Sequence, residues 1–381
     1  MPAKMRLFLD TNIIHGDFYL QGSRISKLCS AAPKLGYELM IPEVVYDEMV
    51  DQYRRELEKH FASYERVVTL TNRTRSGSIV KRLDRVSFLE EKITEYRTMF
   101  STRLDDLHIR IIPYPAVDIK MLVSKELLRK KPFKEVKEHG VGYRDALIWE
   151  TIKVLCVPQE ELIDERAQIE FLTENTADFA DSDGNLHPSL VEELKAKGCL
   201  GNCVQLISNV QEFFETQIDK ELENLENIKN ALLDKGKFNR FNLEQELESL
   251  LNKNFLEKEI LDSDFDSGEL RHLPGYYEEP SIILIDNPIP QEISVRRLED
   301  ESVLIEVNAS ISLTLDFFVF VPDYYNYLEN DKRVDVIDWN WNEHYLLAER
   351  TVTVLTSLSF KTTPSLGKAL SSECQIVAIR F

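Results

Sequence analysis

The sequence lacks the features that mark membrane, secreted and zinc-binding proteins. It has no run of about eighteen or more apolar residues, so no membrane-spanning helix is expected. Its start has no apolar core followed by a small-residue cleavage site, which argues against secretion. Only two of its five cysteines, Cys199 and Cys203, lie close together, and no second pair completes a zinc site. We therefore expect a cytoplasmic protein with reduced, mostly buried thiols and no membrane partner.

The sequence also has too little positive charge, as a whole, for a typical nucleic-acid-binding protein. Its net charge is −20. Residues 217–381 hold 31 acidic and 16 basic residues, a net charge of −15. Residues 54–137 reverse the balance, with 20 basic and 12 acidic residues and a net charge of +8. A basic segment therefore lies inside an acidic protein, and a nucleic-acid partner stays possible.

The first half of the chain alternates strands with helices. Strands are expected at 5–9, 37–41, 109–112, 168–172 and 203–207, and helices at 25–35, from Pro42 onward, at 80–103, at 118–130 and after Gly142. Residues 72–78 are expected to form a loop. This alternation predicts an α/β domain with a parallel sheet covered on both faces.

The second half has a different character. Residues 219–262 are helical and acidic, and the chain from about residue 281 is rich in β-branched residues that often alternate with polar ones. We expect three parts: an α/β domain at 1–218 with a basic helical insert at 54–137, a helical connector at 219–280, and a β-rich accessory domain at 281–381. The last part is expected to bind a protein partner, to self-associate or to restrain the first.

Four acidic residues follow predicted strands or begin predicted helices: Asp10, Glu48, Asp145 and Asp178. Taken alone, each has a more ordinary explanation: a helix cap for Asp10, a solvated helix face for Glu48, a helix start for Asp145 and a turn for Asp178. Open α/β sheets, however, bind ligands at the carboxyl ends of their strands. The order and placement of the four acids therefore favour one shared site.

Carboxylates gathered in this way suit a hard cation. Magnesium takes oxygen ligands, and manganese suits the same donors. Without a cation, neighbouring carboxylates raise one another's pKa. A bound metal makes a water nucleophilic and stabilises a leaving oxygen, which is the chemistry of phosphodiester cleavage. No set of histidines and cysteines favours zinc instead.

Four motifs carry a family resemblance: FLDTNII at 8–14, IPEVVYDEM at 41–49, GYRDALIW at 142–149 and FLTENTADF at 171–179. With them the sequence resembles the PIN-domain (PilT N-terminus-like) nucleases, in the branch that has a long helical insert. The resemblance covers roughly residues 5–215 and implies a three-layer, Rossmann-like domain. It leaves residues 219–381 unassigned.

The resemblance also implies roles for individual residues. Asp10, Glu48, Asp145 and Asp178 would bind Mg²⁺ or Mn²⁺ and carry catalysis, supported by Asn12, Thr173 and Asn175. Many relatives have an acid where this chain has Asn175, so the residue that faces the metal stays open among Asn175, Asp178 and Asp181.

The resemblance further implies an endonuclease with RNA as substrate, and bacterial proteins of this kind often act as toxins or in defence against phage. The alternatives are a structure-selective DNA nuclease and a degenerate scaffold that only binds nucleic acid. The candidate phosphate-binding residues are Arg73, Arg75, Arg129, Lys130, Lys131 and Arg144, and solvated helix faces are the alternative for them. Trp149 is expected in the core, and Tyr143 is expected to pack rather than to stack on a base.

Overall fold

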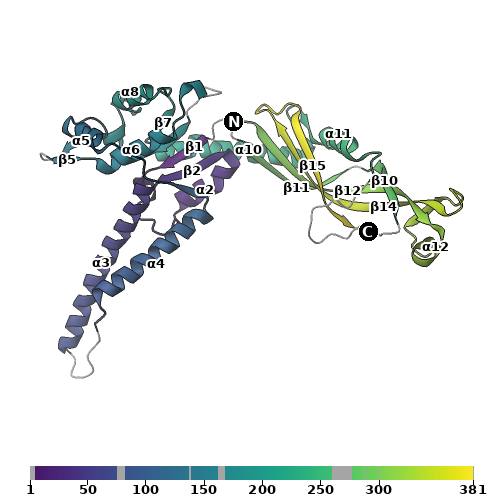
Figure 1. Ribbon diagram of the computed structural model, residues 1–381, viewed down its shortest axis with the longest axis horizontal. Helices are drawn as coiled ribbons and strands as arrows, with labels where there is room; N and C mark the ends of the chain where they lie inside the picture. The colour runs from purple at the N-terminus through teal and green to yellow at the C-terminus, as the bar shows by residue number, and fades with distance from the viewer. Residues whose placement is uncertain are drawn as a thin grey trace. The chain divides into compact units, whose positions relative to one another are not determined.

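The computed structural model describes residues 5–74, 82–136, 139–161, 168–259, 277–286, 288–298 and 300–380. The chain divides into two compact units, Met1–Glu221 and Leu222–Phe381 (Figure 1). None of the helices within the described ranges combines the length and the apolar character that a membrane crossing requires. All five cysteines are free, and three of them are buried.

The first unit is built on a parallel sheet of five strands. These are β1 (Met5–Leu9), β2 (Tyr37–Pro42), β3 (Ile109–Ile112), β6 (Ile169–Leu172) and β7 (Val204–Ile207), in the order β3-β2-β1-β6-β7. Leu7, Phe8 and Leu9 are fully buried because helices cover the sheet on both faces. The expected strands and the α/β fold class are confirmed.

Glycines mark one end of two helices in this unit. Helix α2 (Ser23–Leu35) stops at Gly36, whose φ of 75° lies in the left-handed region that glycine adopts without strain. Helix α6 (Tyr143–Leu155) starts after Gly142 and buries Trp149 completely, as expected. Pro42 differs from expectation, because it ends β2 instead of opening the next helix.

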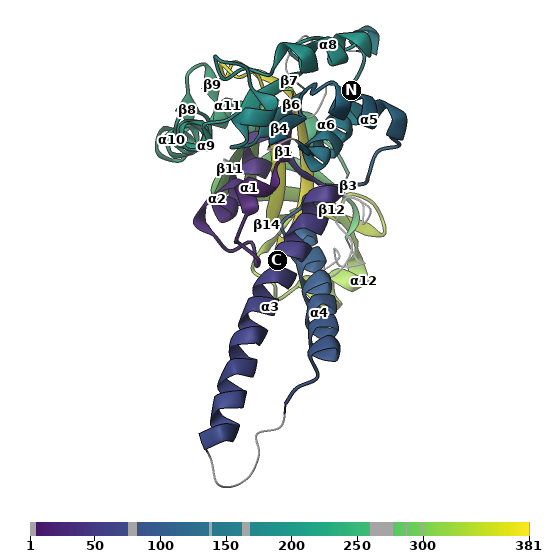
Figure 2. The ribbon, with the colours of Figure 1, turned by 90° about the vertical axis from the view of Figure 1, so that its left-hand side faces the viewer.

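Two long helices, α3 (Glu43–Thr74) and α4 (Arg85–Asp106), run side by side away from the sheet (Figure 2). Aromatic rings join them: the rings of Tyr53 and Tyr96 stack with centroids 4.0 Å apart, and those of Phe61 and Phe88 lie 5.4 Å apart. We call this pair the helical arm.

Two expectations about this region are wrong. Helix α3 continues through Thr74, so Arg73 lies in its last turn and not in a loop; the rest of the expected loop, from residue 75, lies outside the described residues. The basic range 54–137 is also not purely a helical insert. It contains β3, which pairs with β2 as the edge strand of the central sheet.

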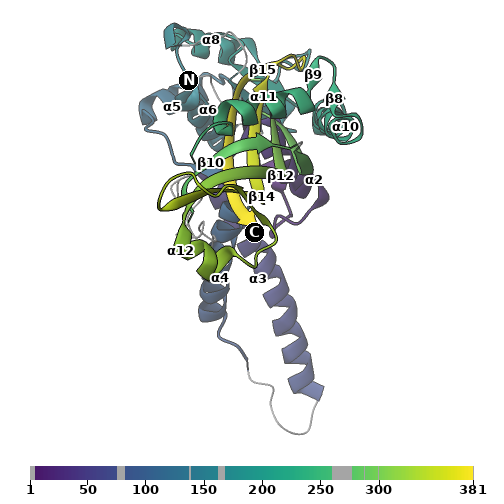
Figure 3. The same ribbon diagram turned by 90° about the vertical axis from the view of Figure 1, so that its right-hand side faces the viewer.

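The second unit contains the helices α10 (Lys220–Lys235) and α11 (Leu243–Phe255), the short helix α12 (Val321–Asp323) and an antiparallel sheet of six strands. A small hairpin of β8 (Lys237–Phe238) and β9 (Phe241–Asn242) lies between α10 and α11 in the sequence. The strands are β10 (Glu278–Ile285), β11 (Ile289–Arg297), β12 (Val303–Phe320), β13 (Val334–Asp338), β14 (Tyr345–Thr362) and β15 (Ala369–Arg380) (Figure 3). Buried and less buried residues alternate along β12 and β14, so one face of the sheet forms a core and the other faces outward. The β-rich expectation is confirmed.

Candidate active site

Asp10 lies at the carboxyl end of β1, where it caps the short helix α1 (Thr11–Ile14). Its Oδ1 accepts a hydrogen bond from the backbone N of Thr11 at 2.6 Å, so Asp10 does act as a helix cap. Its Oδ2 accepts hydrogen bonds from Thr173 Oγ1 at 2.5 Å and from Asn12 Nδ2 at 2.8 Å. Only 4% of Asp10 is exposed, and this burial raises its pKa to about 6 despite the three donors. The capping contact therefore leaves a fixed, buried carboxyl group at the strand end.

Asn175 connects two further acids at the same edge of the sheet. Its Nδ2 donates to Asp145 Oδ1 at 2.9 Å and to Asp178 Oδ2 at 2.6 Å. Asp145 lies in the first turn of α6, and Asp178 lies in α7 (Thr176–Phe179), which follows β6. Burial first, and then the neighbouring charges of Asp178 and Asp10, together raise the pKa of Asp145 to about 7. The three carboxyl groups are therefore close enough to repel one another.

Asp178 is 1% exposed and is the most deeply buried of these acids. Lys134, at the start of β4 (Lys134–Val136), donates from Nζ to Asp178 Oδ2 at 2.7 Å. The other oxygen, Oδ1, has no hydrogen-bond partner among the described residues. No local sequence pattern indicates Lys134, because forty-four positions separate it from the carboxylate that it contacts.

Glu48 reaches the site from the second turn of α3. Its Oε1 accepts a hydrogen bond from Arg144 Nη1 at 2.7 Å, and its Oε2 accepts one from the hydroxyl of Thr11. Thr11 links Glu48 to the Asp10 cap, another contact that the sequence did not reveal. We call Asp10, Glu48, Asp145 and Asp178 the acid cluster.

The hydrogen bonds of Asn175, Asp178 and Asp181 show which of these three residues belong to the acid cluster. Asp181 Oδ1 accepts hydrogen bonds from the backbone N of Asp183 at 2.9 Å and of Asn185 at 3.0 Å, so it holds its own turn together. Asn175 and Asp178 instead contact each other and Asp145. Asp181 thus belongs to the turn, and the other two lie within the cluster.

The acid cluster offers a divalent metal oxygen donors, although basic and amide side chains already contact several of them. No group of three acidic, histidine or cysteine side chains is arranged to hold a metal ion in the ranges that the structure describes. Lys134, Arg144 and Asn175 contact the carboxylates instead. Even so, the donors are all oxygens, one buried oxygen of Asp178 has no hydrogen-bond partner among the described residues, and burial together with mutual repulsion raises the pKa of Asp145. These properties fit a hard divalent cation.

The candidate phosphate-binding residues do not form one patch. Lys131 donates to the carbonyl of Ala177, and Arg144 contacts Glu48, so these two lie beside the acid cluster. Arg129 pairs with Glu126 of the same segment at 2.5 Å, and Lys130 is exposed. Arg73 lies far along the helical arm, and Arg75 lies outside the described residues. Tyr143 packs edge-on against Phe133 with ring centroids 5.0 Å apart, while 46% of it stays exposed.

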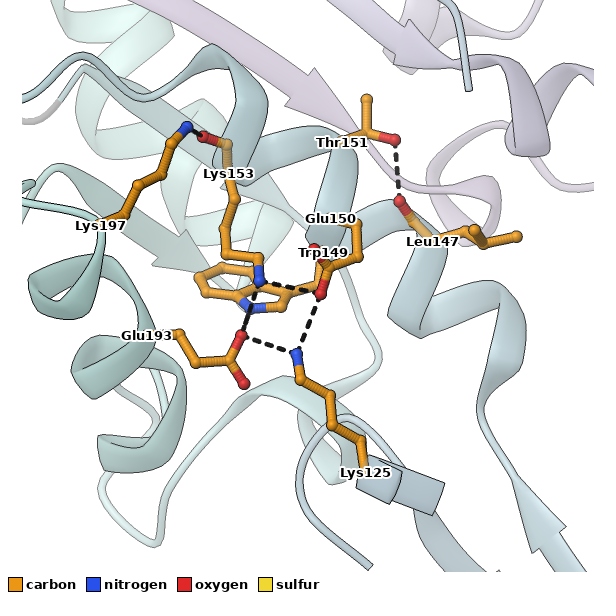
Figure 4. Close-up of polar contacts among 8 residues, drawn as sticks. All are labelled: Lys125, Leu147, Trp149, Glu150, Thr151, Lys153, Glu193 and Lys197. Carbon is orange, nitrogen blue, oxygen red and sulfur yellow. Dashed lines mark hydrogen bonds and ion pairs between the residues drawn. The ribbon is translucent and has the colours of Figure 1, made fainter. Parts of the chain in front are cut away.

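Behind the acid cluster, helix α6 is tied to two neighbouring helices by a buried ion network (Figure 4). Lys125 of α5 (Ile119–Leu127) donates to Glu150 at 2.9 Å and to Glu193 of α8 (Pro188–Ala196) at 2.7 Å. Trp149 Nε1 donates to the same Glu193 oxygen at 2.9 Å. Every charge in this network is paired, which fixes the helix that carries Asp145. Sequence reasoning missed it.

Comparison with known proteins finds one similarity. Residues 7–179 match the family model described as PIN domain. PIN domains are generally nucleases, often acting on RNA, and they typically use divalent metals such as Mg²⁺ or Mn²⁺. No curated protein and no solved structure matches the chain. The matched range contains most of β1, all of β2, β3 and β6, and all four residues of the acid cluster, so the first unit of this chain is similar to PIN domains over that range.

Proposed function

We propose that the protein is an endonuclease that hydrolyses phosphodiester bonds of RNA with Mg²⁺ or Mn²⁺. The observation that carries the proposal is the contact of Asn175 with both Asp145 and Asp178, beside the buried Asp10. Carboxyl groups from three separate segments are held at the carboxyl ends of β1 and β6, where an open α/β sheet binds its ligand.

The acid cluster would act as the metal site. Asp10 is held in one orientation by Asn12 and Thr173, and Glu48 by Thr11 and Arg144. The unsatisfied Oδ1 of Asp178 offers a further donor. When bound, the cation supplies an activated water and stabilises the leaving oxygen. The chain's own residues hold these oxygens in place and keep the buried part of the site from water.

The basic neighbours of the cluster would position the substrate. Lys134 and Arg144 each make one contact with a carboxylate, and 59% of the Arg144 side chain is exposed. A phosphate that enters beside the cluster would give the side chains of Lys134 and Arg144 a second anionic partner. Such contacts hold the backbone of a nucleic acid without reading its bases.

A cleavage assay of the full-length protein tests the proposal. RNA and single-stranded DNA of the same sequence are each incubated with Mg²⁺, with Mn²⁺ and with chelator. We expect metal-dependent cleavage of RNA that chelator abolishes. Preferential cleavage of DNA would favour a DNA nuclease, and binding without cleavage of either strand would favour a scaffold with a degenerate site. Full activity in chelator would contradict the metal assignment.

Asp178→Asn and Asp181→Asn form a matched pair for the same assay. Each substitution removes one carboxylate from the same stretch of chain, but only Asp178 lies within the acid cluster. Loss of cleavage in the first variant alone would locate the chemistry at the cluster. Equal activity of the two variants would locate it elsewhere.

A further inference from the structure

The outward face of the second unit's sheet carries an exposed group of aromatic rings at the end where β12 finishes and β14 begins. Phe318 and Phe320 of β12 pair with Leu347 and Tyr345 of β14, and all four lie on the less buried side of their strands. Trp341 precedes β14, and its ring lies 5.2 Å from that of Phe318, tilted by 32°. Half of Trp341 is exposed, at 51%. We call Phe318, Phe320, Trp341, Tyr345 and Leu347 the aromatic face.

Contacts within the sheet hold these rings in place. The ring of Phe320 lies 5.7 Å from that of Tyr345, and the Tyr345 hydroxyl donates to Glu278 Oε1 at 3.3 Å. Rings that are already ordered lose little conformational freedom when a partner covers them. Exposed aromatic groups of this kind are typical of interaction sites, whereas single scattered apolar residues are not.

A row of acids lies directly beside the aromatic face, and its negative charge favours a positively charged partner. Asp316 of β12 is the register partner of Glu349 in β14, and Glu349 is the register partner of Asp335 in β13. Directly opposed side chains on one face of a sheet lie about 5 Å apart, so the three carboxylates repel one another.

No ion pair neutralises these three acids among the residues that the structure describes. Two other acids of the second unit, one in β12 and one in the turn before it, do have ion pairs. Glu306 pairs with Arg296 at 3.2 Å, and Asp300 pairs with Lys361 at 2.5 Å. Asp316, Glu349 and Asp335 thus form a row of acids, without ion pairs in the described ranges, on the strip that adjoins the rings.

We propose that the aromatic face and its acid row form a docking site for an arginine-rich segment of a partner protein. Guanidinium groups stack on exposed rings and pair with carboxylates through two hydrogen bonds at once. Burying cationic groups here removes the repulsion within the acid row. The same row repels phosphate, so the rings do not serve as a stacking surface for nucleic acid.

Binding of a fluorescent oligo-arginine peptide to the full-length protein tests the proposal, at low and at physiological salt. The comparison ligands are an oligo-lysine peptide of the same length and a single-stranded oligonucleotide. We expect the arginine peptide to bind more tightly than the lysine peptide, and its binding to weaken with salt.

The variants identify the surface. Trp341→Leu should weaken arginine-peptide binding about two- to fivefold, the value of one exposed cation–ring contact, while Trp341→Phe keeps a ring and should retain most of the affinity. The double variant Asp316→Asn/Glu349→Gln should weaken binding further and flatten its salt dependence. The matched control, Glu223→Gln/Glu248→Gln, removes the same charge from exposed positions on α10 and α11 and should change binding little.

Two results would overturn the proposal. One is equal loss of binding in the control and in the acid-row variant, which would make the attraction a property of the whole acidic unit. The other is unchanged arginine-peptide binding in both Trp341→Leu and the acid-row variant while oligonucleotide binding falls, which would make the face a nucleic-acid surface. Circular dichroism checks that each variant is folded. If Trp341→Leu is misfolded, Trp341→Phe and the acid-row variant decide the outcome.

Discussion

Both units bring carboxylates together, but the acids of the first unit are mostly buried and hydrogen-bonded, whereas those of the second lie on an exposed sheet face. In the first unit, Asp10 and Asp178 are buried, and hydrogen bonds from Asn175, Thr173 and Lys134 hold the acids in place. In the second unit, Asp316 and Glu349 lie on the open face of a sheet without an ion pair among the described residues. A buried cluster cannot be screened by solvent, so it favours a resident cation or a bound proton, whereas an exposed row favours a partner that comes and goes.

The largest effect is expected on the cleavage rate, which should depend on the acid cluster of the first unit and not on the acid row of the second. Asp145→Asn should lower cleavage by at least about a hundredfold, on the order of what losing one charge-stabilising group costs an enzyme. Asp10→Asn should do the same. The counterpart in the second unit, Asp335→Asn, should leave cleavage unchanged. Single-turnover cleavage of the proposed RNA substrate measures all three variants. Near wild-type rates for Asp145→Asn would remove the functional distinction between the two groups.

The next largest effect is expected among three residues of the last motif in the first unit. Asp178→Ala should lower cleavage far more than Asp181→Ala, by about ten- to a hundredfold, with Asn175→Ala between them. Asp178 lies within the acid cluster and Asp181 holds a turn, while Asn175 orients two carboxyl groups. The same cleavage assay ranks the three variants. Equal, mild losses would move the site away from this motif.

The stability of the metal-free protein should depend on pH because Asp10 and Asp145 are buried. In the metal-free protein, burial holds the pKa of Asp10 at about 6 and that of Asp145 at about 7, above the ordinary value of 3.8. Below the ordinary value both groups are protonated in the folded and unfolded states, and their contribution to stability is fully present. It is lost as the pH rises from the ordinary value through the raised values, because over that range the unfolded chain has released protons that the folded protein still binds.

Thermal unfolding in chelator checks this expectation. Asp145→Asn should be more stable than the wild type at about pH 8, and the difference should shrink toward about pH 5. Asp181→Asn serves as the control and should show no such trend. A difference that does not change with pH would contradict the assigned cause.

The smallest effect is expected on the exposed row. Glu349→Gln relieves repulsion with Asp316 and Asp335 and should stabilise the protein by roughly 0.2–1 kcal/mol. High salt should reduce this gain because it screens exposed charges. Chemical denaturation at two salt concentrations measures it, with Glu248→Gln as the control. Destabilisation by Glu349→Gln would mean that its carboxylate has a favourable role in the folded sheet.

Sequence reasoning predicted the strands and the order of the four acids because both depend on local patterns. Buried strands such as β1 read as continuous apolar runs, and the acid that follows each run marks the strand end. The contacts of Lys134 and of the Lys125–Glu193 pair depend on how distant segments pack, and no spacing reveals them. The loop expected around Arg73 failed because a helix, once formed, gains a backbone hydrogen bond with each added residue, and α3 continues through Thr74.

The length of α3 sets a scale for the substrate. Glu48 and Arg73 belong to the same 32-residue helix, and at 1.5 Å per residue the twenty-five positions between them span about 37 Å. A nucleic acid that reaches both residues must therefore cover a footprint of about eleven base pairs of duplex. Short oligonucleotides would report on the acid cluster alone. Any contribution of the arm's tip would emerge only when the length of the substrate is increased step by step.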